Sequence, residues 1–351
     1  QGKNEYFILD SRVNASYAMA IALLKDGAEV WRTKARATVK GHVLEPGCFI
    51  VKNAAAAKKA LPALAEKLDL AVLDVDDVSG LDKAPVKFPR IGLFQSWRGN
   101  ADEGWTRYVF DDMAIPYKTL HNADIKGTKE KKADLRADFD VIIFADENTN
   151  TIKGIRPGAT PGGAPGGAES PMARMFRQSP VPPEYEGGIG QEGVDALKAF
   201  IEKGGRMVAL NGASEFAISD FGAPARNSLT GVDRTKFFCP TSILRILVDN
   251  ETPLGYGLPK ETAAMFVNSL ALDTFSPSYE WDRKVVATYP EDEILLSGWL
   301  LGEEYLARKA AVVDTKWKDG RIILIGIRCQ NRAQSHGTYK FLLNALLYPG
   351  M

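Results

Sequence analysis

The segment that most constrains the fold is a short apolar run that breaks into a turn, within residues 206–218. Met207 to Leu210 is predicted to be a buried strand, Asn211-Gly212 is a turn signal, and an amphipathic stretch follows. A strand that enters a helix through a sharp glycine turn is where many α/β enzymes carry a nucleophile. This turn contains no cysteine. Whether the chain is an enzyme therefore depends largely on this position.

The turn belongs to a series of apolar strands that alternate with helices. The expected strands are 91–94, 116–120 and 141–145, and the expected helices are 101–113 and 191–203. Short strands separated by helices predict a doubly wound, mostly parallel sheet with right-handed crossovers. After Phe237 the pattern becomes rich in strands, and Asp319-Gly320 is a hairpin signal. We therefore expect an antiparallel edge on this sheet.

A separate α/β unit is expected before the large sheet. Strands and helices alternate over residues 5–77, and the stretch 76–90 carries two prolines and little apolar periodicity, as linkers do. This predicts an N-terminal α/β unit over residues 1–85 and a second domain over 86–351. The run 151–190 is dense in glycine and proline and too long for an ordinary connection, which is typical of a lid or a binding loop.

Charge and composition argue against several classes of partner. Lys plus Arg and Asp plus Glu both number 44, so there is no electrostatic reason to expect a nucleic acid or an anionic membrane. No apolar run approaches the roughly 20 residues of a membrane span, and no signal peptide is visible. The three cysteines form no C-x-x-C pair and are expected to be buried. No metal site or cofactor is expected in this chain.

Ser214 and His336 form the candidate catalytic pair. Gly212-Ala-Ser214 resembles a nucleophile elbow that lacks its last glycine, and His336 lies in a polar loop after the last expected strand. Both residues follow strands of one sheet, so His336 could accept the serine proton, with Glu215 as a conceivable orienter. The alternative interpretation is that Ser214 caps a helix and that His336 is structural.

Polar and aromatic residues after the expected strands predict a binding crevice, because loops at the carboxyl ends of strands line the site in open α/β sheets. The candidate binding residues are Trp97, Arg98, Glu147, Asn211, Gln330 and Arg332. His42-Val-Leu-Glu45 matches the H-x-x-E pattern of zinc carboxypeptidases, but Pro46-Gly47 follows at once. That pattern is better explained by an exposed hairpin.

Several short sequence motifs occur together along the chain. They include 91–97 (IGLFQSW), 102–107 (DEGWTR), 185–190 (YEGGIG), 297–303 (SGWLLGE) and 334–340 (QSHGTYK). Together they resemble the C-terminal region of large bacterial zinc-carboxypeptidase-like proteins, in which a class I glutamine-amidotransferase-like domain of flavodoxin-like type follows the peptidase domain. That domain type holds a cysteine near Gly212 or Ala213, and this chain has none.

The resemblance implies a non-catalytic accessory module of an exported protein, in a periplasmic or extracellular setting. Zinc would belong to an upstream peptidase domain, which would also be a partner, together with a peptide or a cell-surface glycan. Two alternatives stay open: a hydrolase that uses Ser214 and His336, and a metallocarboxypeptidase in its own right.

Overall fold

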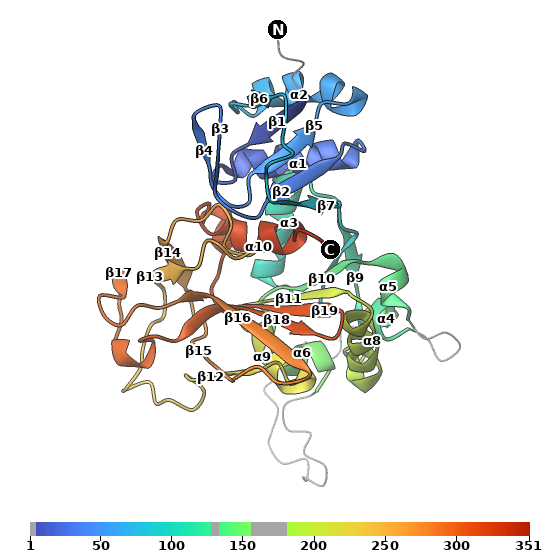
Figure 1. The fold of residues 1–351 in the computed structure, drawn as a ribbon. Helices are drawn as coiled ribbons and strands as arrows, with labels where there is room; N and C mark the ends of the chain where they lie inside the picture. The colour runs from blue at the N-terminus through green and yellow to red at the C-terminus, as the bar shows by residue number, and fades with distance from the viewer. Residues whose placement is uncertain (1–4, 128–132, 156–180) are drawn as a thin grey trace, which may run out of the picture.

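The computed structural model describes residues 5–127, 133–155 and 181–351. A small N-terminal unit is stacked on a larger one, and the C-terminal helix lies between them (Figure 1). Most of the glycine- and proline-rich run 151–190 is outside the described residues. The ends of that run are helical, in α6 (Thr149–Lys153) and η1 (Pro183–Tyr185), where the sequence predicted only loop.

The N-terminal unit is a five-stranded sheet with two helices on one face. Its strand order is β6-β1-β5-β2-β7, and all four pairings are antiparallel. The strands are β1 (Tyr6–Leu9), β2 (Val30–Thr33), β5 (Phe49–Lys52), β6 (Leu73–Val75) and β7 (Lys83–Val86), and the helices are α1 (Asn14–Lys25) and α2 (Ala55–Lys67). A separate hairpin joins β3 (Ala37–Val39) to β4 (His42–Leu44).

The expected linker is partly wrong. Strand β7 lies inside the stretch 76–90 and pairs with β2, with Pro85 opposite Trp31. A proline is tolerated there because β7 is an edge strand, so the missing N–H breaks no ladder. The N-terminal sheet therefore extends to Val86, one residue past the expected domain boundary.

The second unit is built on a twelve-stranded mixed sheet. Strands β9-β8-β10-β11-β19 are parallel neighbours, and β18, β16, β13 and β14 continue the sheet antiparallel. Counted in chain order, the parallel set has the spatial order 2-1-3-4-5 of flavodoxin-like sheets. Its strands are β8 (Ile91–Phe94), β9 (Lys118–Leu120), β10 (Val141–Phe144), β11 (Arg206–Leu210) and β19 (Gly320–Ile325).

Antiparallel strands continue the large sheet beyond β19. Strand β18 (Ala310–Trp317) forms a tight hairpin with β19. Trp317 pairs with Gly320, so the turn residues are Lys318 and Asp319, one position before the predicted Asp319-Gly320. The remaining strands are β12 (Ala225–Asn227), β13 (Ser242–Val248), β14 (Glu261–Phe266), β15 (Leu272–Thr274), β16 (Trp281–Thr288) and β17 (Leu295–Ser297).

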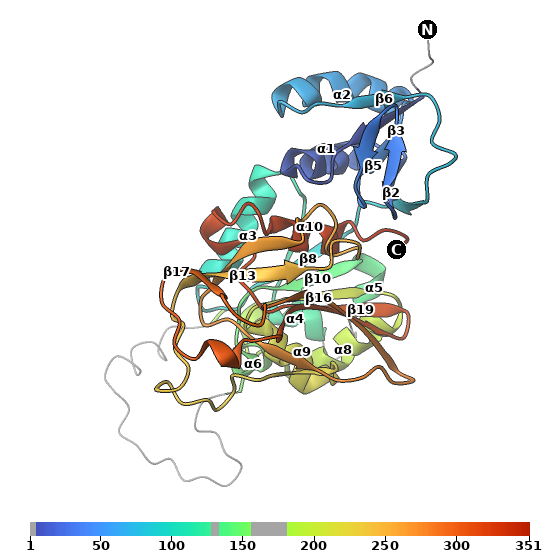
Figure 2. The same ribbon diagram turned by 60° about the vertical axis from the view of Figure 1, so that its left-hand side comes forward.

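Alternate residues of the parallel strands face two different cores. Val208 and Leu210 of β11 belong to one core, whereas Met207 and Ala209 belong to the other. The first core lies under α3 (Ala101–Asp112) and α10 (Tyr339–Leu346) and continues into the N-terminal unit. Helices α4 (Asn122–Lys126), α5 (Leu135–Asp138), α8 (Gly190–Glu202) and α9 (Ala213–Phe221) lie on the opposite side (Figures 1 and 2).

A fully buried polar cluster joins the two units. Asn344 of α10 accepts hydrogen bonds from Tyr17 Oη (2.9 Å) and Arg32 Nη1 (2.8 Å), both in the N-terminal unit. Its own amide donates to the carbonyls of Leu254 and Tyr256, at 2.9 Å each. The Arg32 guanidinium also lies over the rings of Tyr17, Phe49 and Tyr256. Neutral acceptors and aromatic faces thus hold this buried cation.

The amino ends of β8 and β10 are tied together by an ion pair that should make stability depend on pH. Burial alone would raise the pKa of Asp140, but hydrogen bonds from Arg90 and Arg136 hold that pKa well below its usual 3.8. A carboxylate with a depressed pKa in the folded state stabilises the fold above its unfolded pKa, and this stabilisation is lost as the pH falls.

We expect Asp140→Asn to lower the free energy of unfolding by about 1–2 kcal/mol at pH 7. The variant should also lose less stability than the wild type between about pH 5 and pH 2, because the titrating group is gone. Urea unfolding at a series of pH values checks this. An equal pH dependence in both proteins would contradict the assignment.

Candidate functional site

The carboxyl ends of the five parallel strands meet at one edge of the large sheet, where ligand sites of doubly wound folds lie. Ser96 follows β8, Asp146 and Glu147 follow β10, Asn211 follows β11, and Arg328 comes shortly after β19. We use the name strand-end crevice for this set of loops and side chains at the carboxyl edge of the sheet.

Asn211 occupies the sharp turn between β11 and α9. Its backbone is left-handed, with φ of 46°, and its N–H donates to the carbonyl of Ile325 at 2.7 Å. Asparagine tolerates this conformation better than most residues. The side chain is buried, and its Oδ1 has no hydrogen-bond partner among the described residues. The left-handed residue of this turn is therefore Asn211, one residue before Gly212, and an unreactive amide occupies this position.

Arg328 is the centre of a buried ion network. Its guanidinium contacts the carboxylate of Asp102, at the start of α3, and Asp146 Oδ2 at 2.5 Å. Burial raises the pKa of Asp146, while bonds from the Gly212 N–H and the Asn211 amide act against this rise. The adjacent guanidinium also favours the ionised carboxylate. At the base of the crevice, two carboxylates therefore share a single guanidinium.

Aromatic rings form the outer part of the crevice. The Trp97 side chain is 48% exposed and packs on Tyr185, with 5.2 Å between the ring centroids. Tyr185 Oη donates to Gln95 Oε1 at 2.8 Å, and the His121 ring packs against Tyr185, with 4.5 Å between the ring centroids. Glu147 accepts a hydrogen bond of 2.7 Å from Ser96. An exposed, braced indole beside a carboxylate suits a ligand with a flat apolar face and polar edges.

Ser214 and His336 are not brought together. Ser214 is fully buried in the first turn of α9, and its Oγ donates to the carbonyl of Ala209 at 3.2 Å. His336 is exposed, packs against Tyr339, and accepts a bond from Asn14 through its backbone carbonyl. Both residues are described, and no hydrogen bond joins them. The predicted pairing is absent because the Ser214 hydroxyl donates its hydrogen bond to the backbone carbonyl of Ala209 instead of to His336. Glu215 instead bonds Asn227 at 2.7 Å.

The other predicted binding residues are split between the crevice and the protein interior. Arg98 is exposed beside Trp97, at the crevice. Gln330 is buried and donates to Thr106 Oγ1 at 3.1 Å, which is a structural role. Arg332 is exposed, with a left-handed backbone in η3 (Asn331–Ala333). The crevice thus contains Trp97, Arg98, Glu147 and Asn211 of the predicted set.

The H-x-x-E pattern lies on the β3–β4 hairpin, as expected, with His42 exposed and Glu45 paired to Arg36. Over the described parts of the chain, no group of three or more His, Cys, Asp and Glu side chains is arranged to hold a metal. The helices there are also too short or too polar to cross a bilayer. The three cysteines are free and buried, which confirms their structural interpretation.

Sequence reasoning missed the ion network and Tyr185. Asp102 begins the helix after β8, and Arg328 follows β19, so the same strand-end rule places both at this edge. Tyr185 gave no strand-end signal, because it follows a long run of sequence that is dense in glycine and proline.

No family model matches the chain, and no curated protein is significantly similar to it in sequence. Among solved structures, it is similar to a cytoplasmic protein from Salmonella typhimurium, with 12% identity over 74% of this chain and 97% of that one and a TM-score of 0.43. A protein described as ThuA-like from Bacteroides uniformis has 13% identity over 73% and 89%, with a TM-score of 0.37.

The chain is also similar to a β-galactosidase from Bacillus circulans, with 9% identity and a TM-score of 0.38. That similarity covers 75% of this chain but only 31% of the enzyme. Scores this low define no function. The fold itself is a mixed α/β fold with a large mixed sheet, and the function has to be inferred from the chain's own residues.

Proposed function

We propose that this chain is a non-catalytic binding module that holds a glycan at the strand-end crevice. The observation that carries the proposal is Asn211. It occupies the left-handed turn where a nucleophile would be presented, and an amide cannot attack a substrate. The nearest hydroxyl along the chain, that of Ser214, is buried and bonded to Ala209.

The ligand class follows from the crevice surface. Trp97 presents an exposed ring held in place by Tyr185, and Glu147 and Arg98 supply polar groups beside it. Sugar rings offer an apolar face for stacking and hydroxyls for such polar neighbours. A cell-surface glycan therefore fits better than a peptide, whose extended backbone would need a row of free N–H and C=O partners.

The parent protein is part of the same proposal. The sequence resemblance points to the C-terminal region of an exported zinc-carboxypeptidase-like protein, with this unit as its glutamine-amidotransferase-like domain. Zinc and peptide cleavage would then belong to an upstream domain, and the setting would be periplasmic or extracellular. The parallel strand order 2-1-3-4-5 is compatible with such a domain. Zinc carried by this chain, measured by elemental analysis, would instead favour the metallocarboxypeptidase alternative.

Replacing Trp97 with alanine should weaken glycan binding about tenfold, because a stacked aromatic contact is worth roughly 1–1.5 kcal/mol. Isothermal titration calorimetry with a soluble N-acetylglucosamine oligosaccharide measures the change in affinity. Trp299→Ala is the matched control, since that indole is also exposed, at 65%, but follows β17 on the antiparallel side of the sheet. Equal affinities of the wild type and Trp97→Ala, or binding of a short peptide in place of the sugar, would contradict the proposal.

A further inference from the structure

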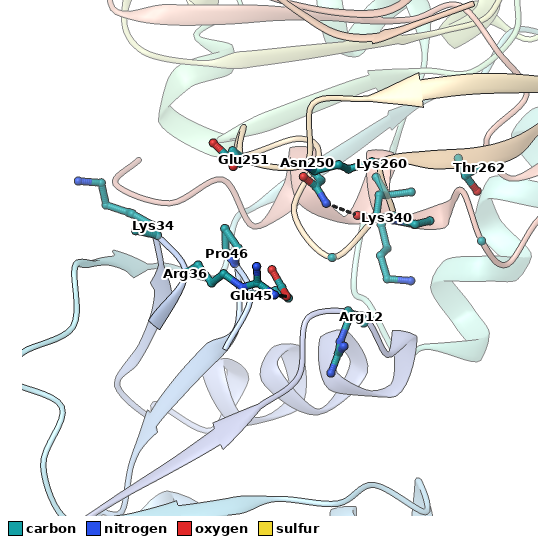
Figure 3. Close-up of a pocket in the computed structure, with 15 residues that line it drawn as sticks. Arg12, Lys34, Arg36, Glu45, Pro46, Asn250, Glu251, Lys260, Thr262 and Lys340 are labelled. Atoms are coloured by element: carbon teal, nitrogen blue, oxygen red, sulfur yellow. Dashed lines mark hydrogen bonds and ion pairs between the residues drawn. The ribbon is translucent and has the colours of Figure 1, made fainter. Parts of the chain in front are cut away.

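A second concave site lies between the two units, away from the strand-end crevice. Its volume is about 760 Å³, within the roughly 300–1,000 Å³ range of small-molecule sites. Residues of the N-terminal unit form one wall, and the loop before β14 with the start of α10 forms the other (Figure 3). We call this site the inter-unit cleft.

The cleft is lined by more cations than anions. The cationic residues are Arg12, Lys34, Arg36, Lys260 and Lys340, and the carboxylates are Glu45 and Glu251. Three of the cations already have partners. Arg36 pairs with Glu45 at 2.9 Å, Arg12 with Asp10 at 2.7 Å, and Lys34 with Asp82 at 3.0 Å. Lys260 and Lys340 have no carboxylate partner within 4 Å in the described chain.

Of these two lysines, Lys340 gives the stronger indication of a bound anion. It belongs to the first turn of α10 and is only 6% exposed, yet its ammonium makes one hydrogen bond among the described residues, to Asn14 Oδ1 at 2.8 Å. An ammonium has three protons to donate. Burial lowers the pKa of Lys340, and the charge of Asp10 acts against this. A buried cation with so few acceptors is costly unless another group completes its bonding.

The two units approach closely beside the cleft, so its walls are fixed. A Cβ on Gly257 would lie 2.0 Å from the Ser11 carbonyl oxygen, and one on Gly47 would lie 2.4 Å from Tyr256 Cβ. Glycine at these two positions leaves room for the Ser11 carbonyl and the Tyr256 side chain. A ligand in the cleft would therefore enter a largely formed site and contact both units.

We propose that the inter-unit cleft binds a small organic anion whose charged oxygens contact Lys340 and Lys260. The apolar surfaces of Pro46, Leu258 and Pro259 line the same cleft and would contact the carbon skeleton. Lysine binds carboxylate and phosphate alike as a point charge, so the anionic group is the shared chemistry. The site is separate from the glycan crevice and does not depend on it.

Calorimetric titration of the full chain at low salt, with citrate and with inorganic phosphate as separate probes, tests the proposal. We expect at least one probe to bind in a one-to-one ratio, and Lys340→Met to weaken it by about tenfold to a hundredfold. Lys260→Gln, which changes an exposed side chain and keeps the fold, should weaken it several-fold. Lys318→Gln, at the exposed β18–β19 turn, and Trp97→Ala should leave it unchanged.

Citrate binding alone would identify a carboxylate ligand, and phosphate binding alone a phosphorylated one. Failure of both probes to bind at millimolar concentration would overturn the proposal. The proposal would also be overturned if Lys260→Gln and a correctly folded Lys340→Met both bound the anion as tightly as the wild type. Should Lys340→Met fail to fold, Lys260→Glu decides the question, because a reversed charge at the cleft must abolish binding of an anion there.

Discussion

Asn344→Leu should lower the free energy of unfolding by about 3–5 kcal/mol, one of the two largest effects that we expect of any single substitution in this chain. Leucine is similar in size to asparagine, so little cavity is created. The loss comes from the hydrogen bonds to Tyr17, Arg32 and two backbone carbonyls, all of them buried. The Arg32 cation then keeps only the carbonyls of Gly47 and Leu347 as close neutral acceptors besides the Tyr17 hydroxyl.

The double variant Arg32→Met with Asn344→Leu separates charge burial from lost packing. Removing the cation that has lost its acceptor should recover at least about 1 kcal/mol relative to Asn344→Leu alone. Urea unfolding of the wild type, the two single variants and the double variant measures the coupling energy between Arg32 and Asn344. Arg226→Met, at an arginine whose side chain is 68% exposed, should change stability by less than about 1 kcal/mol. Strictly additive losses in the cycle would contradict the role given to Asn344.

Arg328→Met should cost a similar amount, about 3–5 kcal/mol at pH 7.5, because it leaves Asp102 and Asp146 buried without their cation. The side chains of these two residues are only 6% and 18% exposed. In the variant, both carboxylates should have folded-state pKa values above their unfolded values. Groups with raised pKa values favour the fold at low pH and disfavour it as the pH rises through the folded pKa.

The defect of Arg328→Met should therefore be smaller at pH 5 than at pH 7.5. Adding Asp102→Asn should restore part of the stability at pH 7.5, since one unpaired charge is removed. Chemical unfolding at the two pH values provides the comparison. A loss of the same size at both, unaffected by Asp102→Asn, would mean that the ion network does not hold the base of the crevice.

The large sheet was the most predictable part of the fold. Val141–Phe144 and Met207–Leu210 are short apolar runs between helical segments, and this pattern is typical of parallel strands covered on both faces. Asp319-Gly320 indicated the β18–β19 hairpin, but the turn itself is formed by Lys318 and Asp319, one residue earlier. The antiparallel pairing of the N-terminal sheet could not be read in the same way, because four-residue strands such as Tyr6–Leu9 carry no signal of direction.

The candidate site was predictable in place but not in detail. The strand-end rule correctly located Trp97, Glu147 and Asn211. It could not tell that the Ser214 hydroxyl turns inward to Ala209, because that choice depends on one backbone turn. The inter-unit cleft gave no signal in the sequence, since Lys340 and Arg12, which both line it, are more than 300 residues apart along the chain.

The central claim is that the strand-end crevice binds a glycan and leaves it intact. The most direct test is mass spectrometry of an N-acetylglucosamine oligosaccharide after prolonged incubation with the purified chain, at a concentration that saturates binding in calorimetry. We predict saturable binding that is about tenfold weaker in Trp97→Ala, with the oligosaccharide recovered at its original mass. Shortened products that disappear in Ser214→Ala or His336→Ala would contradict the claim, as would the absence of any binding.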